Sequence, residues 1–133
     1  MKLSSKTKYG IRACHLLGSV YGLETMSATD LEKRIGVSSK YIEQIMRLLI
    51  KRDIVTASRG ANGGYTLKCP PNEISIGQIV RALEDDIEII ECVSKDGKCK
   101  CCPSSKVWKK LYNGINELLD SMSLEQMIKG EID

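Results

Sequence analysis

Six cysteines occur in the 133-residue chain, and four of them lie within eleven residues. These four are Cys92, Cys99, Cys101 and Cys102. In a secreted protein of this size they would indicate a disulfide framework, but we find no secretory or membrane-spanning segment in the sequence. In a reducing cytoplasm, clustered thiolates favour a metal or iron-sulfur site instead. We therefore expect a cytoplasmic protein whose segment 92–102 has a chemical role.

The cysteine spacing differs from the paired C-x2-C knuckles of a structural zinc site. Because adjacent cysteines seldom both face one metal, we expect three ligands from this segment and a fourth from elsewhere. The candidates for the fourth position are Cys101, Ser105, Cys14 and His15. Free or redox-active thiols without a metal are the alternative interpretation.

Enzyme chemistry has little support in this sequence. His15 is the only histidine, and we find no clustered Asp-His-Ser set and no nucleotide-binding motif. Cys14 and Cys69 stand alone in the sequence, and single cysteines are most often small buried residues. We therefore predict that the protein is not an enzyme.

The net charge of +3 conceals an asymmetry between the two halves of the chain. Residues 1–68 contain 12 Lys and Arg against 5 Asp and Glu, whereas residues 69–133 contain 8 against 12. A basic half attracts a polyanion, because Lys and Arg neutralise phosphates and release counterions. An excess of Lys is also common on solvated surfaces, so charge alone only favours nucleic acid.

Apolar periodicity predicts three helices in the basic half. A stripe at Tyr9, Ala13, Leu16 and Val20 indicates an amphipathic helix over 7–21. Ser27 and Asp30 resemble a capping box that opens a second helix, which Gly36 ends. A third helix begins at Ser38 or Ser39 and runs to about Lys51. Two short helices joined by a glycine turn are typical of a helix-turn-helix.

A hairpin is predicted directly after the third helix. Residues 54–58 and 65–67 have strand composition, and three glycines with an asparagine lie between them. A hairpin at this position is a wing. We therefore expect a mainly helical fold with a small β wing, in which residues 1–84 form a winged helix-turn-helix domain that binds DNA.

Residues 85–133 are expected to form the cysteine segment and a dimerisation helix. Ser75 caps a preceding helix that closes the core, and an acidic stretch then spans 84–91. A long helix from about Ser104 has an apolar seam with heptad-like spacing, which requires a partner helix. The seam consists of Trp108, Leu111, Ile115, Leu118 and Met122.

The exposed side of the third helix and the glycine-rich wing are the candidate DNA-binding surface. A helix fits the major groove, and a wing arginine can enter a narrow minor groove. An ordinary solvated helix face and a plain β-turn are the alternatives, which the turn, the wing and the basic charge together disfavour. The candidate residues are Ser38, Ser39, Lys40, Tyr41, Glu43, Gln44, Arg47, Arg59, Gly60, Asn62, Gly63, Gly64 and Tyr65.

Over essentially its whole length the chain resembles the Rrf2 family of winged-helix regulators, which includes members of IscR, NsrR and CymR type. The resemblance rests on MKLSSKTKYGIRA, VSSKYIEQIMRLLIKRDIV, SRGANGGYTL, EISIGQIVRALE and the VWKKL that follows the cysteines. It implies a dimeric DNA-binding regulator, usually a repressor, whose long C-terminal helix packs against its partner's. By position, 38–44 would form the recognition helix tip and 59–65 the wing.

The resemblance also implies an iron-sulfur cluster on three cysteines of this loop. Matched by distance to Trp108, these are Cys92, Cys99 and Cys102. The chain departs from the IscR pattern because Ser105 replaces a histidine, and from the NsrR pattern because the first helix has no acid before Glu24. CymR-like relatives lack these cysteines. The cluster type and the fourth ligand, Cys101 or Ser105 among the nearby residues, therefore stay open.

The leading hypothesis is a homodimeric repressor of a palindromic operator, with a cluster that senses iron, redox or nitric oxide status. A cluster-free regulator with a thiol switch is the alternative. A metal or redox carrier would need the same cysteines but no basic helix and wing, so affinity for DNA discriminates between these classes.

Overall fold

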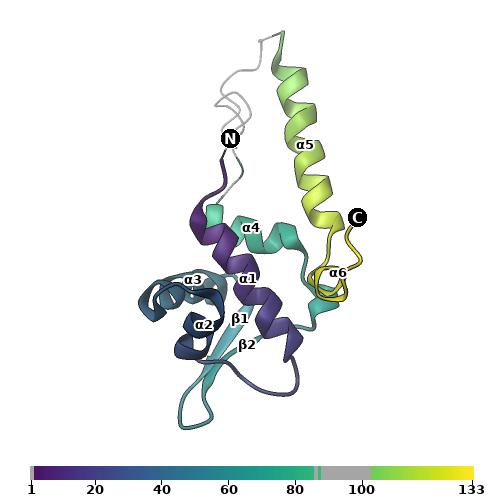
Figure 1. Cartoon of the computed structure of the whole chain (residues 1–133). Helices are drawn as coiled ribbons and strands as arrows, with labels where there is room; N and C mark the ends of the chain where they lie inside the picture. Colours follow the sequence, from purple (N-terminus) through teal and green to yellow (C-terminus); the bar gives the residue numbers. More distant parts are fainter. Residues whose placement is uncertain (1, 86, 88–102) are drawn as a thin grey trace.

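The computed structural model describes residues 2–85, 87 and 103–133. Within these residues a helical body carries a two-stranded hairpin at one end and a long helix that projects from the other (Figure 1). This arrangement confirms the mainly helical fold with a β wing. The elements, in chain order, are α1 (Ser5–Ser19), α2 (Ala28–Ile35), α3 (Ser39–Lys51), β1 (Val55–Ser58), β2 (Gly64–Leu67), the 3-10 turn η1 (Pro71–Glu73), α4 (Ile76–Glu84), α5 (Ser105–Ser121) and α6 (Leu124–Lys129).

The helix-turn-helix is built by local capping, as the sequence predicts. The Ser27 side chain accepts a hydrogen bond from the Asp30 amide, and the Asp30 carboxylate accepts one from the Ser27 amide. Gly36 ends α2 with φ of 89°, a left-handed conformation that glycine adopts at little cost. Ser38 then caps α3. Gly36 and Ser38 thus fix the end of α2 and the start of α3 on either side of the turn.

The buried face of α1 differs from the predicted stripe. Leu17 and Cys14 are fully buried, whereas Tyr9, Leu16 and Val20 are only partly buried. The true core face consists of Thr7, Gly10, Ala13, Cys14 and Leu17. A Cβ at Gly10 would overlap the Leu83 side chain, so α4 approaches α1 most closely where α1 has no side chain.

The wing is an antiparallel hairpin in which Val55 pairs with Leu67 and Ser58 pairs with Gly64. Val55 and Leu67 are buried in the core, which attaches the root of the hairpin to the helices. The hairpin extends from the body at the end opposite the free end of α5 (Figure 1).

The C-terminal helices divide the predicted apolar seam between two faces. Ile115 and Met122 pack against the chain's own core, together with Leu119. Leu111 and Leu118 are exposed although they lie four and three residues from Ile115, so the seam follows the border between the core face and the open face of α5. The helix α6, which the sequence analysis did not predict, packs its buried Leu124 into the core. In the described part of the chain, no helix is both long and apolar enough to cross a membrane.

Candidate nucleic-acid interface and cysteine segment

The amino terminus of α3 is held by side chains on both sides of the turn. The Ser38 hydroxyl accepts a hydrogen bond from the Tyr41 amide at 3.2 Å, and the Ser39 amide donates to Glu32 Oε2 at 3.0 Å. Ser38 rather than Ser39 is therefore the cap. The sequence analysis missed Glu32, because nothing local in the sequence links it to a residue seven positions away.

One face of α3 is buried and the other is open to solvent. Ile42, Ile45 and Leu49 are fully buried, as the periodicity predicts. The predicted DNA-binding side chains Lys40, Glu43, Gln44 and Arg47 are exposed, while Ser39 and Tyr41 are half-buried. The exposed row carries donors and acceptors of the kind that contact base edges and phosphates in a major groove.

The wing root is hydrogen-bonded to the connection between α1 and α2. The Met26 amide donates to the Tyr65 carbonyl at 3.1 Å, and the Tyr65 amide donates to the Met26 carbonyl at 2.8 Å. The Thr25 hydroxyl also donates to the Asn62 carbonyl at 3.1 Å. Thr25 has no distinctive signal in the sequence, so sequence reasoning did not find it. These bonds fix the direction in which the wing leaves the body.

Two glycines make this close approach possible. A Cβ at Gly64, where φ is 153°, would lie 2.8 Å from the Met26 carbonyl carbon and oxygen. A Cβ at Gly63 would lie 2.5 Å from the Ser58 carbonyl oxygen. Both positions therefore exclude side chains for steric reasons. Arg59, Gly60 and Asn62 lie at the exposed tip of the hairpin.

Tyr65 connects the wing to the recognition helix. Partial burial raises the pKa of Tyr65, the Glu43 carboxylate raises it further, and the Arg47 guanidinium opposes both effects. The charges of these two exposed α3 residues thus act on Tyr65, and α3 packs against β1 of the same hairpin. The structure therefore brings α3 and the wing root together on one surface.

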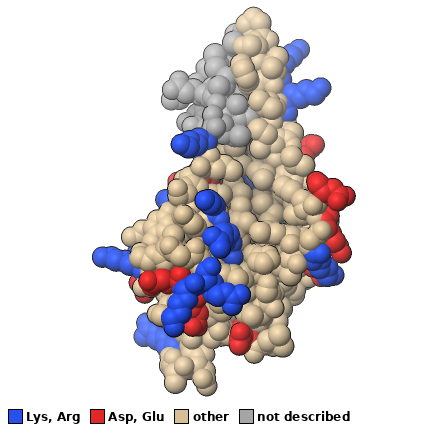
Figure 2. Space-filling view, viewed as in Figure 1, with Lys and Arg blue, Asp and Glu red and all other residues tan. Residues whose placement is uncertain are grey.

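The first turn of α1 lies beside the same surface. The Tyr9 and Tyr41 rings meet edge to face with centroids 6.2 Å apart, and Lys8 Nζ lies 5.4 Å from the Tyr9 ring centroid. Figure 2 shows Lys and Arg side chains gathered over the helices of this part of the molecule, with a few acidic groups among them. The arrangement can accept a phosphate backbone along one side.

The four clustered cysteines, Cys92, Cys99, Cys101 and Cys102, lie outside the described residues. Ser105, the candidate oxygen ligand, is the first residue of α5 and is half-buried. Among the residues that the structure describes, no three His, Cys, Asp or Glu side chains are grouped closely enough to hold a metal ion.

The structure removes one of the proposed fourth ligands. Cys14 is fully buried, and this burial raises the pKa of its thiol to about 12. Burial in the core and a raised thiol pKa both argue against Cys14 as a ligand. Cys69, which we expected to be buried, is only half-buried.

Comparison with known proteins places this fold and surface among transcriptional regulators. The family model described as Rrf2, iron-dependent transcriptional regulator, matches residues 3–130. A similar protein is the transcriptional regulator IscR of Aliivibrio salmonicida, with 33% identity over 99% of this chain and 80% of the relative.

Two solved structures are also similar. The T. potens IscR structure has a TM-score of 0.78 and 32% identity, covering 99% of this chain and 89% of that one. The structure of CymR, the global cysteine regulator of B. subtilis, has a TM-score of 0.78 and 29% identity, covering 100% and 99%. Relatives of both IscR and CymR type therefore match over almost the whole chain.

Proposed function

The chain belongs to the Rrf2 family of transcriptional regulators, and from this premise we propose that it is a cytoplasmic repressor that binds a palindromic operator as a homodimer. DNA binding is common to regulators of this type. The observation that supports our assignment of the DNA-contacting residues is the surface formed by α3 and the hairpin packed against it, where the charges of Glu43 and Arg47 act on Tyr65. We propose that residues 1–84 bind DNA and that residues 85–133 sense the signal and form the dimer.

The DNA-contacting residues are tested by salt dependence and by one matched pair of variants. Contacts to phosphates from two subunits release counterions, so affinity for a palindromic duplex should fall steeply as salt rises. Arg59→Ala should weaken binding and relax any preference for a narrow minor groove, because it removes the guanidinium at the wing tip. Lys110→Ala, on an exposed position of α5, should change little. Equal losses from both variants would show that the DNA-binding face is misplaced.

The dimer interface is proposed on the exposed apolar stripe of α5. Val107, Leu111 and Leu118 are 61%, 46% and 62% exposed. Together with Gly114 they follow one another at offsets of four, three and four residues, which puts them on one face of the helix. Among the described residues, nothing lies within 4 Å of a Cβ added at Gly114, so this part of the chain leaves room for a partner helix beside the α5 backbone. Two-fold symmetry is the commonest way to bury such a stripe.

The signal is proposed to act through an iron-sulfur cluster held by Cys92, Cys99 and Cys102. Thiolates are the natural ligands of such a cluster, which supplies chemistry sensitive to iron supply, oxygen and nitric oxide. Cys101 or Ser105 would supply a fourth ligand. Ser105 lies at the first position of α5, so it adjoins the cysteine segment in sequence.

The cluster is tested by the visible spectrum of protein purified without oxygen. The wild type should be coloured, and Cys92→Ala, Cys99→Ala or Cys102→Ala should each bleach it, whereas Cys69→Ala and Cys14→Ala should not. A wild type that stays colourless after reconstitution would contradict the cluster. The second candidate, a cluster-free thiol switch, would then replace it, since relatives of CymR type match the chain as fully as those of IscR type.

A further inference from the structure

The helices α4 and α5 are joined at two separate points. The first is a pair of backbone hydrogen bonds at the end of α5: the Ile76 amide donates to the Met122 carbonyl, and the Leu124 amide donates to the Ile74 carbonyl, both at 2.8 Å. Leu124 is fully buried beside this pair. The carboxyl end of α5 is therefore fixed to the amino end of α4, and we call this attachment the pivot.

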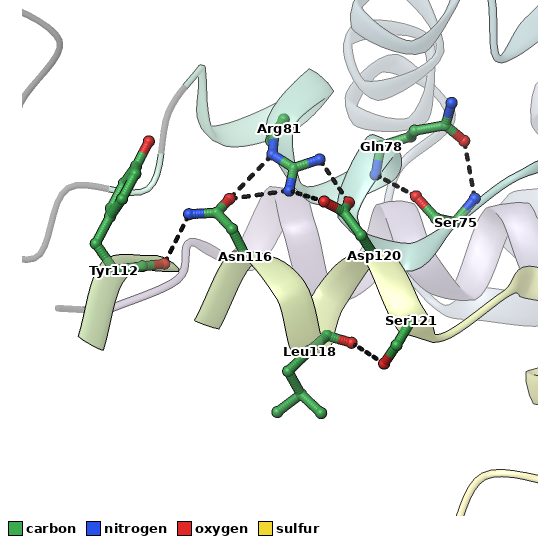
Figure 3. Close-up of polar contacts among 8 residues, drawn as sticks. All are labelled: Ser75, Gln78, Arg81, Tyr112, Asn116, Leu118, Asp120 and Ser121. Carbon is green, nitrogen blue, oxygen red and sulfur yellow. Dashed lines mark hydrogen bonds and ion pairs between the residues drawn. The ribbon is translucent and has the colours of Figure 1, made fainter. Parts of the chain in front are cut away.

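The second point is a side-chain cluster centred on Arg81, which we call the clamp (Figure 3). The Arg81 guanidinium donates to Asp120 Oδ1 at 2.8 Å and to Asp120 Oδ2 at 2.9 Å. Its Nε and Nη2 also donate to Asn116 Oδ1 at 3.2 and 2.9 Å. Asn116 Nδ2 donates to the Tyr112 carbonyl at 2.9 Å, which turns the amide oxygen toward the guanidinium. The two-pronged geometry fixes direction as well as distance.

Gly77 makes room for the clamp on α4. A Cβ at this position would overlap Asp120 Oδ1 and would lie 3.0 Å from Arg81 Nη1. Gly77 is buried within the helix, where glycine costs roughly 1 kcal/mol relative to alanine. Glycine, a poor helix former, therefore occupies the position of α4 where a side chain would displace the Arg81–Asp120 ion pair.

The pivot and the clamp together determine the angle at which α5 leaves the body. At 1.5 Å per residue, Asn116 lies about 9 Å along α5 from Met122, and Leu111 lies about 16 Å along it. A rotation of about 10° around the pivot would thus move Leu111 by about 3 Å. Adding one base pair between two half-sites separates them by about 3.4 Å. The displacement is therefore comparable with the axial rise of one base pair, which also rotates one half-site relative to the other by about 35°.

On its other side α4 is firmly attached to the DNA-binding helices. Glu84 Oε1 accepts hydrogen bonds from the Ser4 amide, the Ser4 hydroxyl and the Thr7 hydroxyl, each at 2.6 Å. Leu83 packs closely on Gly10 of α1 and lies near Ile45 of α3. A change in the orientation of α4 would therefore also move α3, the proposed recognition helix.

We propose that the clamp of Gly77, Arg81, Asn116 and Asp120 determines which half-site spacing the dimer accepts. The proposal rests on the α5 dimer of the proposed function. With the α5 stripes joined in the dimer, the clamp angle fixes where each α3 lies relative to its partner. The clamp residues are positioning residues, because they hold α4 against α5 and belong to neither the proposed DNA-binding surface nor the proposed dimer stripe.

The test measures the affinity of the full-length protein for palindromic duplexes whose half-sites are separated by the preferred spacing, by one base pair more and by one base pair fewer. Arg81→Met keeps the apolar stem of the side chain and removes the guanidinium. Asp120→Ala removes the other partner of the ion pair. Because Asp120 is half-exposed, this variant should still fold if Arg81→Met does not. Lys110→Met, at an exposed position of α5 outside the clamp, is the matched control.

The wild type and Lys110→Met should discriminate against the wrong spacings by about tenfold or more, a penalty of the size that one mismatched base pair in a site causes. Arg81→Met and Asp120→Ala should remain dimeric and keep their affinity for random duplex, while the discrimination falls to about threefold or less. Folded dimeric variants with the wild-type spacing preference would overturn this inference alone. A monomeric wild type would instead overturn the proposed dimer, and the spacing inference with it.

Discussion

Leu118→Asp should dissociate the dimer. Leu118 is 62% exposed in the single chain, and full burial of a leucine is worth about 1.5–3 kcal/mol. Burying the exposed part is thus worth about 1–2 kcal/mol in each subunit, and two-fold symmetry counts it twice. An aspartate there also loses hydration at the interface. The dimer should therefore be weakened by at least about 3 kcal/mol, which raises its dissociation constant by roughly a hundredfold or more.

Sedimentation equilibrium over a range of protein concentrations measures this change directly. Leu23→Asp is the matched control, because Leu23 is 84% exposed but lies in the connection after α1, away from α5. Leu118→Asp should sediment as a folded monomer that binds a palindromic duplex weakly, since two half-sites require two linked subunits. If Leu118→Asp dimerises as tightly as Leu23→Asp, the stripe on α5 is not the interface.

Three further results are expected. Gly64→Ala should lower DNA affinity by about tenfold or more in a mobility-shift assay while the helices stay folded, because the new Cβ meets the Met26 backbone at the wing root. An unchanged affinity would contradict the role of the wing. Partial burial raises the pKa of Glu84, but hydrogen bonds from Ser4 and Thr7 outweigh it and hold the pKa below the ordinary value of 4.5. A carboxylate whose pKa is lowered by folding stabilises the folded state when it is ionised. Glu84→Gln should therefore lower the free energy of unfolding by about 1 kcal/mol at pH 7, as measured by urea unfolding. The difference in stability between the variant and the wild type should shrink as the pH falls below about 4. Peptide mapping after alkylation at neutral pH should find Cys14 modified only when the protein unfolds, because burial raises the pKa of its thiol to about 12.

The helix-turn-helix and the wing could be predicted because their signals are local. Ser27, Asp30 and Gly36 lie within ten residues of one another, and each performs the capping role that its type suggests. The glycines between the two strands mark a hairpin in the same way. Features of this kind depend on backbone conformation and a few neighbouring atoms, so sequence alone carries them.

Side chains that contact distant elements were harder to predict. In α1 the periodicity identified a helix but not its buried face, because Gly10 is a contact point that has no hydrophobic side chain to reveal it. In α5 one apolar pattern serves two surfaces, with Ile115 on the core and Leu118 exposed. For α6 a signal was present, since Ser123 and Gln126 form a capping box that resembles the one at Ser75.

The clamp had no signal in the sequence at all. Arg81 and Asp120 are 39 residues apart, and neither residue is unusual in a charged helix. They meet only because the pivot returns α5 alongside α4, so their contact depends on the completed fold. The DNA-contacting and cysteine residues stay predictions that rest on residue type and on the family resemblance, and the experiments above test each group separately.

The position of α4 explains how a signal in the cysteine segment would reach DNA. In chain order this segment begins at the end of α4 and leads into α5, the two helices that the clamp joins. On α4, Arg81 contacts α5 and Glu84, three residues later, contacts α1. A ligand at the segment can act only through different affinities for two arrangements of the protein. In our proposal the DNA spacing depends on the α4–α5 angle, and the cysteine segment lies between these two helices in the chain, so a cluster or thiol switch that altered this angle would change operator affinity without touching α3. Spacing discrimination should therefore differ between the two states of the switch in the wild type, and it should not differ in Arg81→Met.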